Sequence, residues 1–230
     1  MSIYSADRIS SVSPTDGSVS SNGYPRKRAR TRRQLLIAGM QELAAHGPDG
    51  TTIAQVAHRA HVSTGTFYNH FDSLGTLVGA IVDELASGVE IARDVLAQME
   101  HDPAALLAIG ARQLLDLART DPPTASAFVN LLATVPAFRR RVQATVRTAI
   151  ADGIAAGRFE HRPAEITADA VIGVVTQWMR SRLIGEFNAA LESDRLVLVL
   201  EIAGLPRTDA EAVVDHMSET LSIAATATSR

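Results

Sequence analysis

Side chains able to bind a polyanion gather in two neighbouring stretches near the N-terminus. The first is the basic run Arg26-Lys27-Arg28-Ala29-Arg30-Thr31-Arg32-Arg33, and the second is the polar stretch from Ser63 to His70. Cations neutralise phosphates, and neutral hydroxyl, amide and imidazole groups can read base edges or bind phosphate oxygens. A basic run alone is equally typical of a solvated helix start, but its position beside the second stretch favours DNA binding.

Groups able to catalyse a reaction form no comparable cluster. The chain has no cysteine, which excludes disulfides, thiolate metal sites and cysteine nucleophiles. Its seven histidines are scattered. Neither the pair His58 and His61 nor the pair Asp209 and Glu211 has a third ligand or a base nearby in the sequence. We therefore expect neither an enzyme nor a protein with a metal or another cofactor.

Charge is divided unevenly along the 230-residue chain. Through Val78 there are eight Arg or Lys against five Asp or Glu, and from Gly79 onward fourteen against twenty. A front of charge +3 and a rear of charge −6 are typical of a small nucleic-acid module joined to an acidic body. The sequence has no apolar run of the roughly 18 residues that a membrane span needs and no signal-peptide pattern, so we expect a cytoplasmic protein.

The elements that would position these groups are three short helices. Leu35 to Ala44 has helical spacing and should end near His46–Gly50, where two glycines and a proline break it. Thr52 and Gln55 form a predicted capping box for a second helix. After a short turn, Ser63 is a suitable N-cap for a third helix from Thr64 to His70. The stretch from Thr52 to Phe71 is thus predicted to be a helix-turn-helix.

This stretch closely resembles the DNA-binding motif of the TetR family of bacterial repressors. The resemblance rests on Thr at the second helix cap, Ile-Ala-x-x-Ala before the turn, Val-Ser after it, and Gly65-x-x-Tyr68-x-x-Phe71 in the third helix. Two positions differ from the family pattern. His61 occupies a turn position that is usually Gly, which costs about 1 kcal/mol in a left-handed conformation. Leu74 replaces a Lys that commonly contacts a phosphate, a contact that the arginine-rich segment is expected to replace.

The resemblance implies how the motif would bind DNA. Thr64, Gly65 and Thr66 would lead the recognition helix into the major groove, and Asn69 could pair with adenine. Thr52, Ser63, Tyr68 and His70 suit phosphate oxygens. Phe67 and Phe71 are instead expected in the core. The arginines would follow the backbone or enter the minor groove. The predicted DNA-binding residues are Arg28, Arg30, Arg32, Arg33, Thr52, Ser63, Thr64, Gly65, Thr66, Tyr68, Asn69 and His70.

The remainder of the chain shows only helical spacing, so the protein is predicted to be all-α. We expect a disordered tail at 1–23, the helix-turn-helix domain with its basic arm at 24–76, and a helical effector-binding and dimerisation domain at 77–230. A Gly153-x-x-x-Gly157-x-Phe159 pattern is also similar to the family. The predicted helices of the larger domain run from Ser73 to Met99, Pro103 to Arg119, Thr124 to Ala133, Pro136 to Ala156, Ile166 to Phe187, Asp194 to Ala203 and Asp209 to Ala225.

The resemblance also implies partners. Helix 166–187 is apolar over more than one face, so it is either central or shared with a partner, and helix 209–225 carries an apolar stripe. In the family the last long helices form the dimer, which implies a homodimer here that would match a palindromic operator. A hydrophobic small-molecule effector of unknown identity would bind inside the body and release double-stranded DNA. The alternative is a TetR-like activator, or a protein-interaction module with weakened DNA binding. Candidates by residue type for the effector pocket are Gln113, Phe128, Asn130, Phe138, Trp178 and Met179.

Overall fold

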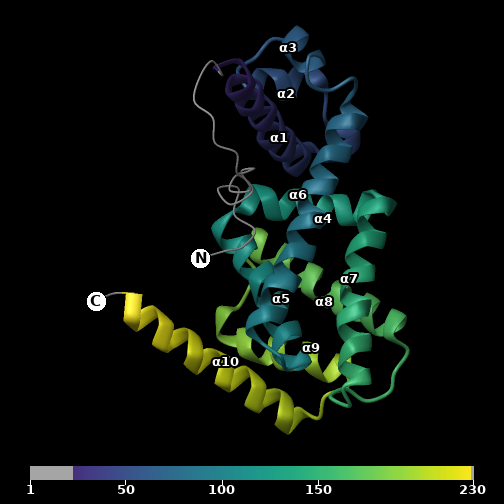
Figure 1. The fold of residues 1–230 in the computed structure, drawn as a ribbon, viewed down its shortest axis with the longest axis vertical. Helices are drawn as coiled ribbons and strands as arrows, with labels where there is room; N and C mark the ends of the chain where they lie inside the picture. The colour runs from purple at the N-terminus through teal and green to yellow at the C-terminus, as the bar shows by residue number, and fades with distance from the viewer. Residues whose placement is uncertain (1–22, 229–230) are drawn as a thin grey trace.

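The computed structural model describes residues 23–228, and this part of the chain is helical without a strand. We call residues 23–81 the head and residues 82–228 the body; the helix α4 runs from one into the other (Figure 1). The elements are α1 (Gly23–Gly50), α2 (Ile53–Arg59), α3 (Thr64–Tyr68), α4 (Leu74–Met99), α5 (Pro103–Thr120), α6 (Pro122–Thr134), α7 (Pro136–Ala155), α8 (Ala164–Leu183), the short 3₁₀ helix η1 (Ala189–Leu191), α9 (Glu192–Ala203) and α10 (Arg207–Thr228).

The head folds around one small apolar centre. Leu35 and Leu43 of α1 and Phe67 of α3 are fully buried there, as their helical spacing predicts. α4 crosses α1 closely at Gly39, where an added Cβ would lie 2.8 Å from Leu77 and 2.9 Å from Ile81. These contacts fix the recognition helix relative to the two long helices of the head.

The N-terminal half of α1 contains the predicted basic arm. Residues 26–33 are helical and continue into the rest of α1, so they present their charges at helical spacing. The helix is broken at Gly47, which has φ 69° and lies within the predicted stop at His46–Gly50. The predicted disordered tail lies outside the described residues, except for Gly23, which begins α1.

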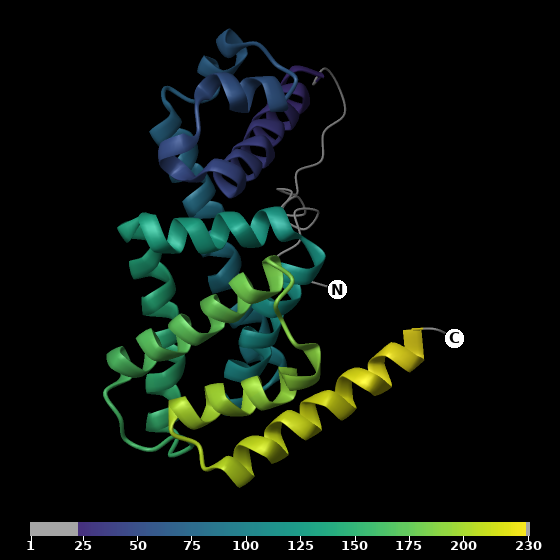
Figure 2. The same cartoon turned by 180° about the vertical axis from the view of Figure 1, so that it is seen from behind.

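The body packs its helices around α5, which contacts α6 to α10 (Figure 2). Asp102, Asp121 and Val135 each precede a proline that opens the next helix, so the predicted breaks are confirmed. α8 ends at Leu183, earlier than the predicted Phe187, because the chain turns at Gly185 with φ 79°. In the described residues, no helix has the length and apolarity that crossing a membrane demands.

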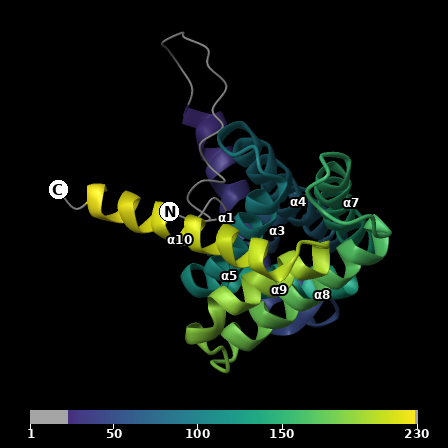
Figure 3. The same ribbon diagram turned by 90° about the horizontal axis from the view of Figure 1, so that it is seen from below.

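The helix α10 packs only partly on the body. Its Ala210, Val214 and Met217 are buried, and it contacts α5 and α9. Viewed from below, its C-terminal half reaches past the rest of the molecule (Figure 3). The last helix thus combines one buried stripe with a projecting end.

Candidate nucleic-acid interface and effector cavity

The second helix of the motif begins with the predicted capping box. The Thr52 hydroxyl accepts a hydrogen bond from the Gln55 backbone N–H at 3.3 Å, and the Gln55 side chain accepts one from the Thr52 N–H at 2.8 Å. At its other end, the Arg59 guanidinium binds the Glu42 carboxylate of α1. Glu42 is 4% exposed and also pairs with His46 at 3.0 Å. Caps and this ionic contact hold α2 against α1.

The turn between α2 and α3 adopts the left-handed conformation anticipated at His61. His61 has φ 55°, and no other non-glycine residue in the described chain has a positive φ. The His61 N–H donates to the His58 carbonyl at 3.0 Å, and the Val62 N–H donates to the Ala57 carbonyl at 3.0 Å. The turn keeps its hydrogen bonds, although a side chain at this φ is strained relative to glycine.

The recognition helix buries one face and exposes the other. Phe67 and Phe71 are buried with their ring centroids 5.8 Å apart, as predicted for core residues. Thr64, Gly65 and Asn69 are exposed, and Tyr68 is 56% exposed although it is large and aromatic. An exposed tyrosine flanked by small polar groups is suited to a partner surface rather than to a core.

A hollow of about 510 Å³ separates the recognition helix from the start of α1. Lys27, Arg28 and Thr31 line it from α1, and Thr66, Asn69 and His70 line it from the recognition helix and the residues after it. Two cations therefore share one concave surface with four side chains that can form neutral hydrogen bonds. This arrangement can hold a phosphate backbone while the recognition helix meets base edges.

Burial lowers the pKa of the His70 imidazole below its ordinary value, and the positive charges of Arg28 and Arg32 lower it further. The imidazole is therefore neutral near pH 7 and can donate or accept a hydrogen bond without a net charge.

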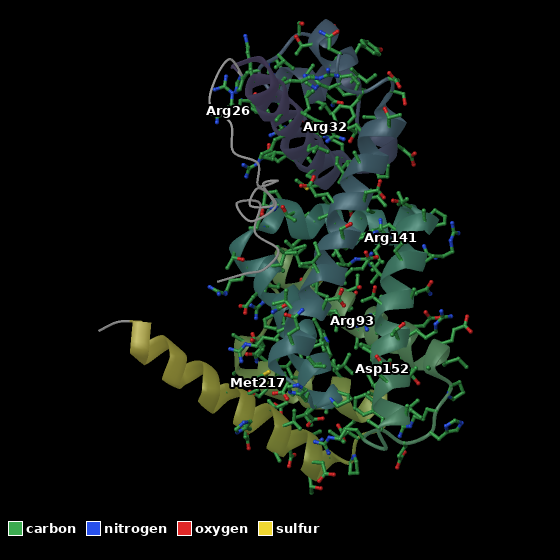
Figure 4. The ribbon with its side chains drawn as sticks, in the orientation of Figure 1. Arg26, Arg32, Arg93, Arg141, Asp152 and Met217 are labelled. Carbon is green, nitrogen blue, oxygen red and sulfur yellow. The ribbon has the colours of Figure 1, made fainter. Side chains whose placement is uncertain are left out.

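Sequence reasoning missed Lys27 and Thr31 in this hollow. The signal was present in the spacing: positions 27, 28 and 31 share one face of a helix, and the basic run was read as an arm instead. Among the predicted arginines, Arg30 and Arg32 are exposed, and Arg32 lies 4.9 Å above the Phe71 ring centroid (Figure 4). That contact gives Arg32 a packing role beside any role in DNA binding.

Thr52 and Ser63, which were predicted to bind phosphates, act as helix caps in this structure. The Thr52 hydroxyl is engaged with Gln55, and the Ser63 hydroxyl accepts from the Thr66 N–H at 3.1 Å. Leu74, which stands where the family commonly has Lys, is half-buried against the apolar core. The residue at that position contributes packing instead of a charge.

The body contains an apolar cavity of about 170 Å³ between five helices. Val89, Arg93 and Leu96 of α4 form one wall, and Phe128 and Leu132 of α6 close the side toward the head. The remaining lining comes from α4 at Ala97 and from α5, α7 and α8: Pro103, Leu106, Leu107, Gly110, Ala111, Leu114, Val142, Thr145, Val146, Ala149, Asp152, Val171, Ile172, Val175 and Thr176.

An ion pair lies at the edge of this cavity. Arg93 of α4 and Asp152 of α7 approach to 3.8 Å, with side chains 39% and 63% exposed (Figure 4). Nearer the head, Arg141 of α7 binds Asp83 at 3.0 Å and Glu90 at 3.1 Å. These pairs link α4 to α7, so the helix that leads to the DNA-binding head also forms a wall of the cavity.

Of the six residues predicted for the effector pocket, Phe128 lines the cavity. Phe138 and Met179 are fully buried elsewhere in the core, and half-buried Trp178 lies under Arg195 at 5.9 Å. Gln113 faces a separate groove between α5 and α10. Asn130 points to the head, where its amide donates to the carbonyls of Leu43 at 3.1 Å and Ala44 at 3.4 Å.

Two family models match the chain in the regions that form the head and the body. The model described as bacterial regulatory proteins of the tetR family matches residues 35–81. The model described as the tetracyclin repressor-like C-terminal domain matches residues 102–216, half of the chain. The match thus includes the helix-turn-helix and most of the helices around the cavity.

Individual relatives agree with these matches. Over 75 residues the chain is 32% identical to the probable acrEF/envCD operon repressor of Escherichia coli K12, covering 32% of this chain and 34% of that repressor. The fold is similar to RolR crystallised with resorcinol, with TM-score 0.60, 23% identity and coverage of 83% and 95% of the two chains. It is also similar to a gamma-butyrolactone receptor, with TM-score 0.66, 14% identity and coverage of 84% and 99%. The chain belongs to the TetR family of DNA-binding transcription regulators, which are not enzymes.

Proposed function

We propose that this regulator is a homodimeric repressor that binds a palindromic operator and is released by a small hydrophobic ligand. The observation that carries the proposal is the hollow in which Lys27 and Arg28 meet Thr66, Asn69 and His70. It combines cations for phosphates with neutral groups for bases on one exposed surface. The protein would act in the cytoplasm, where its operator lies.

Within this surface, each group has a role that follows from its chemistry. Thr64, Thr66 and Asn69 would read base edges, since their hydroxyl, methyl and amide groups match the major-groove pattern. Lys27, Arg28, Tyr68 and His70 would hold phosphates and fix the register of the recognition helix. Thr52, Ser63, Arg30, Arg32 and Arg33 remain secondary candidates around this set.

Two features support dimerisation through the helices 166–187 and 209–225. An exposed stripe follows one face of α8 through Ile166, Ala170, Gly173, Gln177 and, just past its end, Ile184, with Ile166 70% and Ile184 68% exposed. The second feature is the course of α10, whose C-terminal half projects past the rest of the molecule (Figure 3). Together, the stripe and α10 could form a four-helix interface. A two-fold dimer would place two recognition helices about 34–36 Å apart, one turn of DNA.

The ligand would release the operator if it binds more tightly to a conformation in which the head is placed unsuitably for the operator. The cavity touches α4, which continues into the head, and α6, whose Asn130 holds the end of α1. Replacing Asn130 with Ala should weaken the coupling between ligand and operator binding by about threefold to tenfold, with ligand affinity itself little changed. Operator titrations with and without ligand would measure this factor. An unchanged factor would exclude this contact from the route.

The relatives support a regulator with an effector site. The Escherichia coli protein is named a probable operon repressor, and RolR was crystallised with resorcinol as its ligand. Apart from its α4 wall, the cavity of this chain lies in the part matched by the C-terminal family model.

Footprinting of purified protein on the DNA upstream of its own gene tests the proposal. At low salt we expect one protected palindrome and, by analytical ultracentrifugation, a dimer bound to it. Absence of any protected palindrome would overturn the repressor proposal. It would favour a protein-interaction module, the alternative suggested by the uncharged Leu74, whereas transcription that rises on binding would identify an activator.

The side-chain roles can be separated on the same operator. Tyr68→Phe should weaken binding to all sequences alike, because a phosphate contact carries no sequence information. Thr66→Ala and Asn69→Ala should instead relax the preference at particular base pairs. Affinities measured on a set of single-base operator variants distinguish the two outcomes, and equal losses on every variant would contradict the base-reading role.

A further inference from the structure

The cavity in the body is small for an effector site. Its volume of about 170 Å³ is below the roughly 300 Å³ at which pockets for drug-sized ligands begin. A protein cavity of about 150 Å³ holds one benzene molecule. By proportion, the cavity accommodates about seven non-hydrogen atoms, which is one six-membered ring with one substituent.

The chemistry of the walls selects an apolar body for that ligand. Apart from four polar residues, the described lining is apolar or glycine. Phe128 closes the side nearest the head and meets Phe138 edge-on at 5.1 Å between centroids. An aromatic ring entering the cavity can therefore pack against aliphatic walls and an aromatic side chain. The four polar residues are Arg93, Thr145, Asp152 and Thr176.

The edge of the cavity selects the polar group. Arg93 supplies donors and Asp152 supplies acceptors, 3.8 Å apart in a loose and half-exposed pair. A hydroxyl is a donor and an acceptor at once, so it can bond to both without adding charge. A carboxylate would face the negative charge of Asp152, and a carboxylate drawn further inside would lose its hydration without a partner. The Thr145 hydroxyl is already engaged with the Arg141 carbonyl at 3.2 Å.

We propose that the cavity binds an uncharged single-ring compound carrying a hydroxyl, with its ring toward Phe128 and its hydroxyl between Arg93 and Asp152. The binding of this compound is independent of the proposed function. Its role as the signal that releases the operator rests on the proposed function. Acyl chains and fused rings of more than about ten non-hydrogen atoms exceed the volume available.

Calorimetric titration of the full-length protein with four compounds tests the ligand class. Phenol is expected to bind at one site per chain. Toluene has the same size without the hydroxyl and should bind about tenfold more weakly, as should benzoate with its charge. 1-Naphthol should bind more weakly still. Failure of phenol to bind, or tighter binding of 1-naphthol or benzoate, would overturn the proposal.

Substitutions test whether the compound binds in this cavity. Gly110 lines the cavity, and a Cβ added there would meet no atom within 4 Å, so Gly110→Leu can begin to fill the cavity without a clash at its Cβ. Phenol binding should then fall at least tenfold, whereas Gly79→Leu, an exposed helical glycine with equally open space, should leave it unchanged. Asp152→Ala should remove the preference for phenol over toluene and keep toluene binding. Full phenol affinity in Gly110→Leu would overturn the assignment, as would a retained preference in Asp152→Ala.

Failure of this proposal and failure of the proposed function give different results. Operator binding by the unliganded protein is measured separately and does not depend on phenol. Phenol that binds in the cavity but does not release the operator would refute the signalling role and leave the binding site intact. An operator-binding protein that ignores phenol would refute the ligand class alone.

Discussion

The head and the body place their functional groups in opposite ways. In the head, the groups suited to DNA stand on the surface, and the small core beneath them is held by helix caps such as Thr52 and Ser63. In the body, the functional feature is a partly open cavity, and its walls come from five helices. Substitutions in the head should therefore change binding chemistry directly, whereas those in the body act through packing. Each of the following tests should change one region and leave the other.

The largest expected effect is in the body, at Gly153. The chain turns after α7 at Gly157, which has φ 68°, and the buried ring of Phe159 then packs back against Gly153. A Cβ added at Gly153 would lie 2.2 Å from this ring. Gly153→Ala should lower the free energy of unfolding by about 3 kcal/mol, because the ring cannot move without opening the core. Urea unfolding followed by the fluorescence of Trp178, the single tryptophan, reports on the body.

Gly79→Ala is the matched control for that substitution. It also adds a methyl group to a helical glycine, but the methyl meets nothing within 4 Å. It should stabilise the head by up to about 1 kcal/mol through helix propensity and leave the unfolding reported by Trp178 unchanged. Equal effects of the two substitutions would show that the contact with Phe159 is unimportant.

In the head, the next effect should be on operator affinity. Arg28 lines the hollow beside the recognition helix, and Arg30, on the same helix, does not. Arg28→Ala should weaken operator binding about tenfold and reduce the slope of log affinity against log salt by about one. Arg30→Ala should have a smaller effect on both, and thermal unfolding of the body should be unchanged in either variant. Equal losses would mean that the whole basic segment acts as a diffuse charge.

The same contrast explains what could be predicted from the sequence. Helix caps, proline starts and the left-handed turn at His61 are local, so spacing and residue type were sufficient to predict them. The helix-turn-helix and most helix boundaries were correct for this reason. Whether residues 26–33 are helical could not be decided from the sequence, because a basic run has no apolar stripe to reveal its helical continuation.

The cavity could not be predicted in this way. Its shape depends on which residues of five helices leave space between them, and that is a property of packing. Phe128 was identified by residue type alone. Asn130 was polar and near the correct helix face, but its amide is directed to the carbonyls at the end of α1. Residue type thus suggested candidates for the pocket. Only the three-dimensional arrangement shows which of them line the cavity, which lie in the core and which contact the head.

A smaller effect is expected at the turn of the motif. Because His61 has φ 55°, His61→Gly relieves strain and should stabilise the head by about 0.5–1 kcal/mol after the entropic cost of glycine. Amide hydrogen exchange should slow around Ala57 and Val62, with no change in the body. Operator affinity should stay within about twofold. Slower exchange throughout both regions would show that head and body unfold as one unit.

The smallest effect is the pH dependence of operator binding through His70. In the free protein, burial and the charges of Arg28 and Arg32 lower the pKa of the imidazole. Nearby phosphates would stabilise its protonated form, so the pKa in the complex is higher than in the free protein and binding takes up a proton. Operator affinity should therefore rise by about threefold as the pH falls from 7.5 to 6. The rise is small because binding takes up less than one proton per chain. His70→Gln should remove this rise, whereas His58→Gln, on the exposed surface of α2, should keep it. A rise that survives in His70→Gln would mean that another group takes up the proton, and that the hollow between α1 and α3 does not face the phosphates.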